Sequence, residues 1–122
     1  MEKQNSSVGT VKEIRIRITL DEQQIPEQIC WEADDAGPTT FRSKAVVLGM
    51  WDESSHDGMH LNLWTKQMTV EELGMFVFQV LVELANMYRR ATQDEAGGRE
   101  LMGAAHRFAR WLGQAGRWHG KA

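Results

Sequence analysis

Residues 61–73, LNLWTKQMTVEEL, carry the change from strand to helix that decides the fold class. Two leucines alternate with Asn62 at the start, which is typical of a half-buried strand. Thr69 and Glu72 then have the T-x-x-E spacing of a capping box, in which each side chain accepts a hydrogen bond from a backbone N–H at the start of a helix. The stretch therefore predicts a strand that leads into a capped helix.

Two long helices are predicted to follow. The first has a wide apolar face at the 3.6-residue period, made up of Leu73, Phe76, Val77, Val80, Leu81, Leu84, Ala85 and Tyr88. Thr92 and Glu95 repeat the capping-box spacing, so the last helix is predicted to start near residue 93. Its apolar stripe consists of Leu101, Ala105, Phe108 and Leu112, flanked by Ala104 and Trp111.

The segment before these helices predicts an antiparallel hairpin over residues 11–34. Apolar and polar side chains alternate strictly along its first strand. The apolar members are Ile14, Ile16, Ile18 and Leu20, and the polar members are Arg15, Arg17 and Thr19. After a polar interruption at residues 21–24, a second alternation of Ile29, Trp31 and Ala33 predicts the returning strand.

Residues 39–51 are predicted to contain a short helix. The pairs 44 with 48 and 47 with 51 fall on neighbouring helical turns, which favours a helix. Two β-branched valines and Gly49 count against it. The polar segment 52–58 is then predicted to be a loop that leads into the strand ending at Trp64.

The predicted order is therefore β-β-α-β-α-α, an α+β fold. Three strands cannot surround two amphipathic helices, so both C-terminal helices are expected to pack on one face of a small antiparallel sheet. The chain of 122 residues is expected to form a single domain in which residues 1–10 and 113–122 are flexible. The uncovered sheet face is expected to carry Arg15, Arg17, His60, Asn62 and Trp64, together with Thr19, Gln28 and Cys30.

The cysteine count and the apolar runs indicate a cytoplasmic location. Cys30 is the only cysteine, so no internal disulfide can form and a reducing compartment fits best. The polar N-terminus lacks the apolar core of a secretory signal. The most apolar run, residues 75–82, is much shorter than the roughly 20 residues of a membrane span.

No catalytic constellation, metal site or cofactor is predicted. The possible metal ligands are His56, Asp57 and His60 with Asp52 and Glu53, but a loop and a strand do not hold them as helical zinc motifs do. A solvated loop is the simpler interpretation. Cys30 has no activating base nearby in the sequence, so a half-buried hydrophobic role is preferred.

The net charge of −3 is unevenly distributed, with a small basic region at the C-terminus. Its cations are Arg107, Arg110, Arg117 and Lys121, interleaved with Phe108, Trp111 and Trp118. This composition could contact phosphates and stack bases. A basic helix end that complements the helix dipole is the preferred interpretation, and nucleic-acid binding is the weakest of the functional hypotheses.

Trp64 is the best local indication of a contact surface. It places an aromatic side chain on the strand face that His60 and Asn62 mark as polar, and tryptophan is enriched at interfaces. The alternative is that Trp64 closes the end of the core, near Trp31 and Trp51. Both interpretations stay open at the level of sequence.

Four segments resemble the gliding motility protein GldC family, in the family's order. They are KEIRIRITLDEQQIPEQICWEADDAG (residues 12–37, its opening hairpin), KAVVLGMWD (44–52, its short helix ending in Trp-Asp), LNLWTKQMTVEEL (61–73, its strand and capped helix) and RRATQDE (89–95, its second helix junction). Together they cover about residues 12–95.

The resemblance implies a non-enzymatic accessory protein that acts by protein–protein interaction with the gliding machinery. It carries over no catalytic residue. The candidate protein-binding residues remain Arg15, Arg17, His60, Asn62 and Trp64. The alternative function is a small chaperone-like protein or a homo-oligomer that hides its sheet face. The tail GQAGRWHGKA, residues 113–122, departs from the family pattern.

Overall fold

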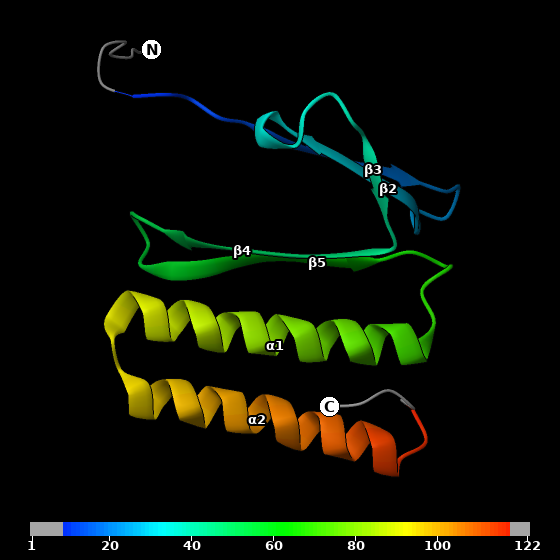
Figure 1. The fold of residues 1–122 in the computed structure, drawn as a ribbon. Coiled ribbons are helices and arrows are strands. Elements are labelled where there is room, and N and C mark those ends of the chain that lie inside the picture. The colour runs from blue at the N-terminus through cyan, green and yellow to red at the C-terminus, as the bar shows by residue number, and fades with distance from the viewer. Residues whose placement is uncertain (1–8, 118–122) are drawn as a thin grey trace. The chain divides into compact units, whose positions relative to one another are not determined.

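The structure, a computed structural model, describes residues 9–117 and divides the chain into two compact units. The first unit, residues 1–67, contains the strands, and the second, residues 68–122, contains two long helices (Figure 1). The single domain expected from the chain length stays a prediction. The flexibility expected for residues 1–10 and 113–122 lies mostly outside the described residues.

The first unit opens with a three-stranded antiparallel sheet, here called sheet A. Its strands are β1 (Ile14–Leu20), β2 (Pro26–Ala33) and β3 (Phe41–Ser43), in the order β1-β2-β3. The predicted N-terminal hairpin is therefore confirmed. The ladder has one irregularity, a register shift at Thr19/Leu20.

Sheet A has one apolar face and one charged face, as the alternation in the sequence predicts. On the apolar face Ile16 lies opposite Trp31, and the Trp31 ring stacks on Phe41 with centroids 4.7 Å apart. Ile29, at 1% exposure, is the best-buried large side chain of this face. On the charged face Arg15 lies directly opposite Glu32.

The short helix predicted within residues 39–51 is wrong, because this segment forms strands. After β3, the strand β4 (Ala45–Asp52) pairs along its whole length with β5 (Asp57–Trp64). The two valines of β4 suit a pleated strand, and each glycine of the pair lies opposite a bulky residue: Gly49 faces His60 and Gly58 faces Trp51. An eight-residue ladder outweighs the two helical i,i+4 pairs that the sequence offers.

The strands β4 and β5 form a second, two-stranded sheet, here called the ribbon. The strand ending at Trp64 thus pairs with β4 and not with the N-terminal hairpin, which corrects the prediction of one three-stranded sheet. The loop predicted at residues 52–58 shortens to a tight turn. In it Asp52 accepts the backbone N–H of Ser55 at 2.8 Å, and His56 takes the left-handed conformation with φ 56°.

The second unit is a hairpin of two helices, α1 (Val70–Thr92) and α2 (Glu95–Gln114), which run side by side (Figure 1). The capping box predicted at the start of α1 is confirmed. The Thr69 hydroxyl accepts the Glu72 N–H at 3.0 Å, and the Glu72 carboxylate accepts the Thr69 N–H at 3.0 Å. No helix among the described residues is long and apolar enough to cross a membrane.

The second predicted capping box, Thr92 with Glu95, is wrong. The cap of α2 is Asp94, whose carboxylate accepts the Gly97 N–H at 2.9 Å and the Tyr88 hydroxyl at 2.7 Å. Thr92 instead donates its hydroxyl to the carbonyl of Tyr88 in the last turn of α1. Asp94 and not Thr92 therefore caps α2, and the Tyr88 hydroxyl holds the second oxygen of its carboxylate.

Small residues let α1 and α2 approach closely. The buried positions of the two helices are Gly74, Ala85, Gly98, Ala105, Ala109 and Leu112. Leu112 fills the space beside Gly74, where a Cβ would lie 2.9 Å from its Cδ2. The predicted class, small antiparallel sheets followed by two C-terminal helices, is confirmed; the packing of the helices on a sheet face stays a prediction.

Candidate functional site

The five predicted protein-binding residues lie on two different sheets. Arg15 and Arg17 belong to β1 of sheet A, whereas His60, Asn62 and Trp64 belong to β5 of the ribbon. All five are exposed. The structure therefore presents two candidate surfaces in place of the single sheet face that the sequence predicted.

The first surface is the charged face of sheet A. Arg15 donates to Glu32 at 2.8 Å and to Glu13 at 3.0 Å, and the Thr40 hydroxyl donates to the same Glu32 carboxylate at 3.2 Å. The hydrogen bonds from Arg15 and then from Thr40 lower the pKa of Glu32. Arg15 is thus engaged within the sheet.

Arg17 is held more loosely than Arg15. Its guanidinium lies 3.4 Å from Glu32, and its side chain is 65% exposed. Its cross-strand neighbour Cys30 lies between it and Arg42, which donates to Gln28 at 3.3 Å. On this surface Arg17 and Arg42 are therefore both held less tightly than Arg15.

The second surface is one face of the ribbon, here called the tryptophan face. Directly opposed residues of an antiparallel pair share a face, so Trp51 lies on the same side as His60, Asn62 and Trp64. Trp51 is 71% exposed and Trp64 is 59% exposed. Val47, opposite Asn62, completes the face. Two large aromatic rings thus flank a polar centre.

Glycines shape the centre of the tryptophan face. The His60 imidazole lies over both Gly49 and Gly58, because a Cβ added at these glycines would be 3.1 Å and 2.9 Å from its ring nitrogens. The two glycines therefore hold the imidazole close to the strands. Among residues 9–117, no group of three His, Cys, Asp or Glu side chains is arranged to hold a metal ion.

The opposite face of the ribbon is wholly apolar through its central six positions. Its residues are Val46, Leu48, Met50, Met59, Leu61 and Leu63. Met50 is 62% exposed and adjoins Trp51 in the strand while pointing to the other side. The ribbon thus separates an aromatic and polar face from an aliphatic one.

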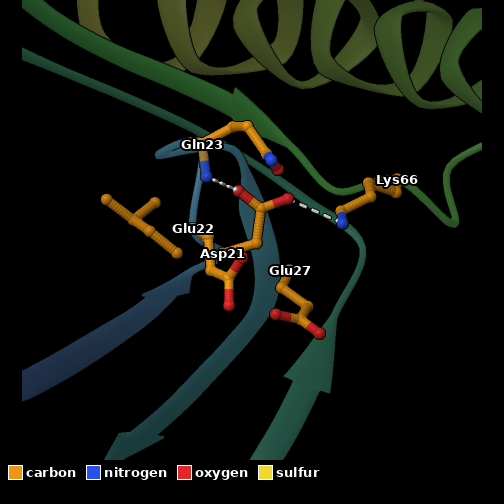
Figure 2. Close-up of a pocket in the computed structure, with 6 residues that line it drawn as sticks. Asp21, Glu22, Gln23, Glu27 and Lys66 are labelled. Carbon is orange, nitrogen blue, oxygen red and sulfur yellow. Dashed lines mark hydrogen bonds and ion pairs between the residues drawn. The ribbon is translucent and has the colours of Figure 1, made fainter.

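A polar cavity of about 550 Å³ adjoins the turn between β1 and β2 (Figure 2). Asp21 accepts the backbone N–H groups of Gln23 at 2.8 Å and Ile25 at 2.9 Å, and it lies 2.6 Å from the Lys66 ammonium. The Lys66 contact, followed by the Ile25 N–H, lowers the pKa of Asp21. A carboxylate held charged in this way is a poor proton donor at neutral pH, so we interpret Asp21 as a structural group of the turn.

A family model described as gliding motility-associated protein GldC-like matches residues 26–114, from β2 to the end of α2. The chain belongs to the GldC-like family. The match confirms the family indicated by the sequence motifs, and it includes the whole ribbon. No curated protein and no solved structure matches the chain.

Trp51 belongs to the tryptophan face of this GldC-like chain, but the sequence analysis does not include it among the candidate binding residues. The sequence predicts a helix for residues 39–51, and a helix gives residue 51 no fixed position relative to Trp64. The two glycines could have indicated the strand pairing. In one register Gly49 lies opposite the bulky His60 and Gly58 lies opposite the bulky Trp51, so each glycine makes room for a large side chain.

The basic C-terminal region of the GldC-like chain is only partly described. Arg107 and Arg110 are exposed on α2, and the rings of Phe108 and Trp111 stack with centroids 6.4 Å apart. Trp118 and Lys121 of the predicted nucleic-acid surface lie outside the described residues. The two aromatic rings of the described part contact each other within one helix.

Proposed function

We propose that this GldC-like chain is a non-enzymatic accessory protein of the cytoplasm that binds a protein component of the gliding machinery. Family membership supports the association with gliding motility. The single, unpaired cysteine, Cys30, supports a reducing compartment. The contact is made mainly through the tryptophan face.

The observation that carries this proposal is the exposure of two tryptophans on one face of the ribbon. Tryptophans dominate the binding energy of protein interfaces because each ring removes a large apolar area from water and loses little side-chain entropy. Between Trp51 and Trp64 lie the imidazole of His60 and the amide of Asn62, which can form oriented hydrogen bonds. An aromatic rim around polar groups suits recognition of a protein surface.

The charged face of sheet A is proposed as a secondary contact. Arg15 is bound by the carboxylates of Glu13 and Glu32, so its role is to hold that face in shape. Arg17 extends further into solvent and suits an acidic group of the same partner. Removal of Arg17 is therefore expected to weaken partner binding less than removal of Trp64.

Affinity purification from a gliding bacterium that expresses the tagged full chain tests the proposal. The wild-type chain is expected to recover a component of the gliding machinery. Because an interface tryptophan is commonly worth about 2 kcal/mol, Trp64→Ala is expected to weaken binding by about 30-fold. Met50→Ala, on the opposite face of the same ribbon, is the matched control and is expected to recover the partner normally.

Thermal unfolding of both variants separates a binding role from a folding role. Trp64→Ala is expected to melt within a few degrees of Met50→Ala, since both side chains are more than half exposed. If Trp64→Ala recovers every partner of the wild-type chain and only lowers the melting temperature, Trp64 closes the core and the proposed function loses its site.

A further inference from the structure

The outer edge of β5 has no strand partner among residues 9–117. The groups that it presents follow from one hydrogen bond: Thr65, the next residue, donates its N–H to the carbonyl of Lys44 at 2.8 Å on the β4 side. Backbone groups alternate in direction along an antiparallel strand. The N–H and C=O groups that point away from β4 are therefore those of Gly58, His60, Asn62 and Trp64.

This edge lacks the side chains and irregularities that protect strand edges from pairing. Charged side chains, prolines and bulges commonly block the addition of a strand. The β4–β5 ladder is free of bulges, and residues 58–64 contain neither a charged residue nor proline. The edge strand β1 differs, because it carries two arginines and a register shift at Thr19/Leu20. A two-stranded ribbon is also only marginally stable by itself.

We propose that β5 pairs antiparallel with β5 of a second copy of this chain, about a twofold axis at Leu61. The two ribbons then form one four-stranded sheet. Residues with outward backbone groups must oppose one another, and the axis at Leu61 meets this condition. It sets Asn62 against His60 of the second copy, and Trp64 against Gly58 of the second copy.

In this register each tryptophan of the row lies opposite a small residue. Within one chain, Trp51 already lies opposite Gly58. Pairing at Leu61 adds Trp64 of the second copy on the other side of Gly58, followed by its Ala45, so that large and small residues alternate across four strands. The neighbouring row sets the imidazole of His60 beside the amide of Asn62, which can exchange a hydrogen bond.

The aliphatic face of the ribbon is equally compatible with this register. Leu61 meets Leu61 of the second copy, and Leu63 meets Met59 of the second copy. Directly opposed apolar side chains of this kind stabilise antiparallel sheets. The pairing is isologous, so it closes into a dimer at this edge.

Other positions of the twofold axis fit less well. An axis at His60 would oppose two imidazoles, and an axis at Asn62 would oppose the bulky side chains of Trp64 and His60.

The outer edge of β4 is the competing site. An axis at Leu48 would set Ala45 against Trp51 of a second copy, which also matches in size. However, Ala45 and Val46 line an apolar pocket of about 140 Å³ together with Ile16 and Trp31 of sheet A. Sheet A thus lies beside the start of β4, where the tryptophan of the second copy would have to fit. The edge of β5 is therefore favoured.

The molar mass in solution gives the first test, with a pair of matched proline variants. The wild-type chain is expected to show twice 13.9 kDa by light scattering at high concentration. Asn62→Pro removes an outward N–H at the centre of the β5 edge and is expected to give a monomer. Val47→Pro removes the corresponding N–H of the β4 edge, since these residues are paired. It is expected to remain a dimer.

A disulfide test reports the register even if a proline variant fails to fold. In a Cys30→Ser background, Leu61→Cys places two thiols at the axis, in a non-hydrogen-bonded pair with Cα atoms about 4.5 Å apart, within disulfide range. Oxidation is expected to link two chains covalently. Leu48→Cys, the residue opposite Leu61 on β4, is the control and is expected to remain unlinked.

A wild-type monomer at high concentration, or a disulfide formed through Leu48→Cys and not through Leu61→Cys, would overturn the pairing. This inference does not depend on the proposed function. A monomeric chain would leave the partner contact through Trp64 to its own purification experiment, and a dimer that recovers no partner would retain the pairing.

Discussion

Lys66 lies 2.6 Å from the carboxylate of Asp21, which joins the segment that leaves β5 to the turn between β1 and β2. The Asp21 side chain is only 10% exposed, and its other oxygen accepts two backbone N–H groups of that turn. One carboxylate therefore fixes a local turn and also connects the two sheets of the first unit.

Lys66→Met is expected to lower the free energy of unfolding and to change its pH dependence. The pKa of Asp21 is lowered from 3.8, so its contribution is present above that value and is lost as the pH falls through the lower folded pKa. The pKa of Lys66 is raised from 10.5, so its contribution is present below that value and is lost as the pH rises through the higher folded pKa.

Urea unfolding across these two pH windows checks the prediction. The variant is expected to lose the part of the alkaline change that Lys66 contributes. Its acid change is expected to be smaller and to be complete at a higher pH than in the wild-type chain, because the folded pKa of Asp21 is then closer to 3.8. Lys12→Met is the control, because the Lys12–Asp35 pair is well exposed and such pairs contribute little. Equal losses in the two variants would contradict a special role for Lys66.

Thr69→Ala is expected to destabilise the helical unit by about 1 kcal/mol, the usual value of an N-cap. Asp94→Ala is expected to cost at least as much, because Asp94 also binds the Tyr88 hydroxyl. Thr92→Ala is the matched control: Thr92 does not cap α2, so its removal should cost clearly less than that of Thr69. Chemical denaturation monitored by circular dichroism measures all three. A larger cost at Thr92 than at Asp94 would restore the capping box expected from sequence.

Gly74→Ala is expected to destabilise the helix hairpin although alanine favours helices. The new methyl group would lie 2.9 Å from Leu112, which is 3% exposed. Overpacking costs about 1–3 kcal/mol, against a gain in helix propensity of about 1 kcal/mol. A double-mutant cycle with Leu112→Ala measures the coupling. The double variant should be more stable than the sum of the single effects indicates, and strict additivity would contradict the contact.

Gly58→Ala is expected to displace the imidazole of His60 and to weaken partner binding, because the added Cβ would lie 2.9 Å from Nε2. NMR chemical shifts of the imidazole report the displacement. Gly58→Ala is also expected to lower the melting temperature, because the added methyl group collides with the imidazole. Removal of the imidazole in the double variant Gly58→Ala/His60→Ala is expected to restore it. An unchanged imidazole spectrum in Gly58→Ala would contradict the described position of His60.

The sequence predicts the parts of this fold that depend on local signals. The alternation from Ile14 to Leu20 and the pair of Thr69 with Glu72 each act within a few residues, and both are confirmed. The ribbon was missed because residues 44–51 fit two periods, and the choice between them depends on pairing with residues 57–64. The cap at Asp94 differs from the predicted one because Thr92 and Asp94 are both favourable N-cap residues two positions apart, and the spacing from Thr92 to Glu95 favoured the wrong one.

The candidate site likewise has features that local sequence predicts and features that depend on strand pairing. Alternation correctly indicates that His60, Asn62 and Trp64 share one strand face. It cannot indicate that Arg17 lies on another sheet, because strand order is a property of the whole first unit. Trp51 joins the face only through the β4–β5 ladder, which a single segment does not reveal.

Site-specific photo-crosslinking in the native cell tests the central claim most directly. A p-benzoylphenylalanine residue is introduced at Trp51 in one strain and at Met50 in another; these neighbours are 71% and 62% exposed and point to opposite faces of the ribbon. We expect position 51 to form a covalent adduct with a component of the gliding machinery and position 50 to form none with that component. An adduct with that component from position 50 alone, or from neither position, would contradict binding through the tryptophan face.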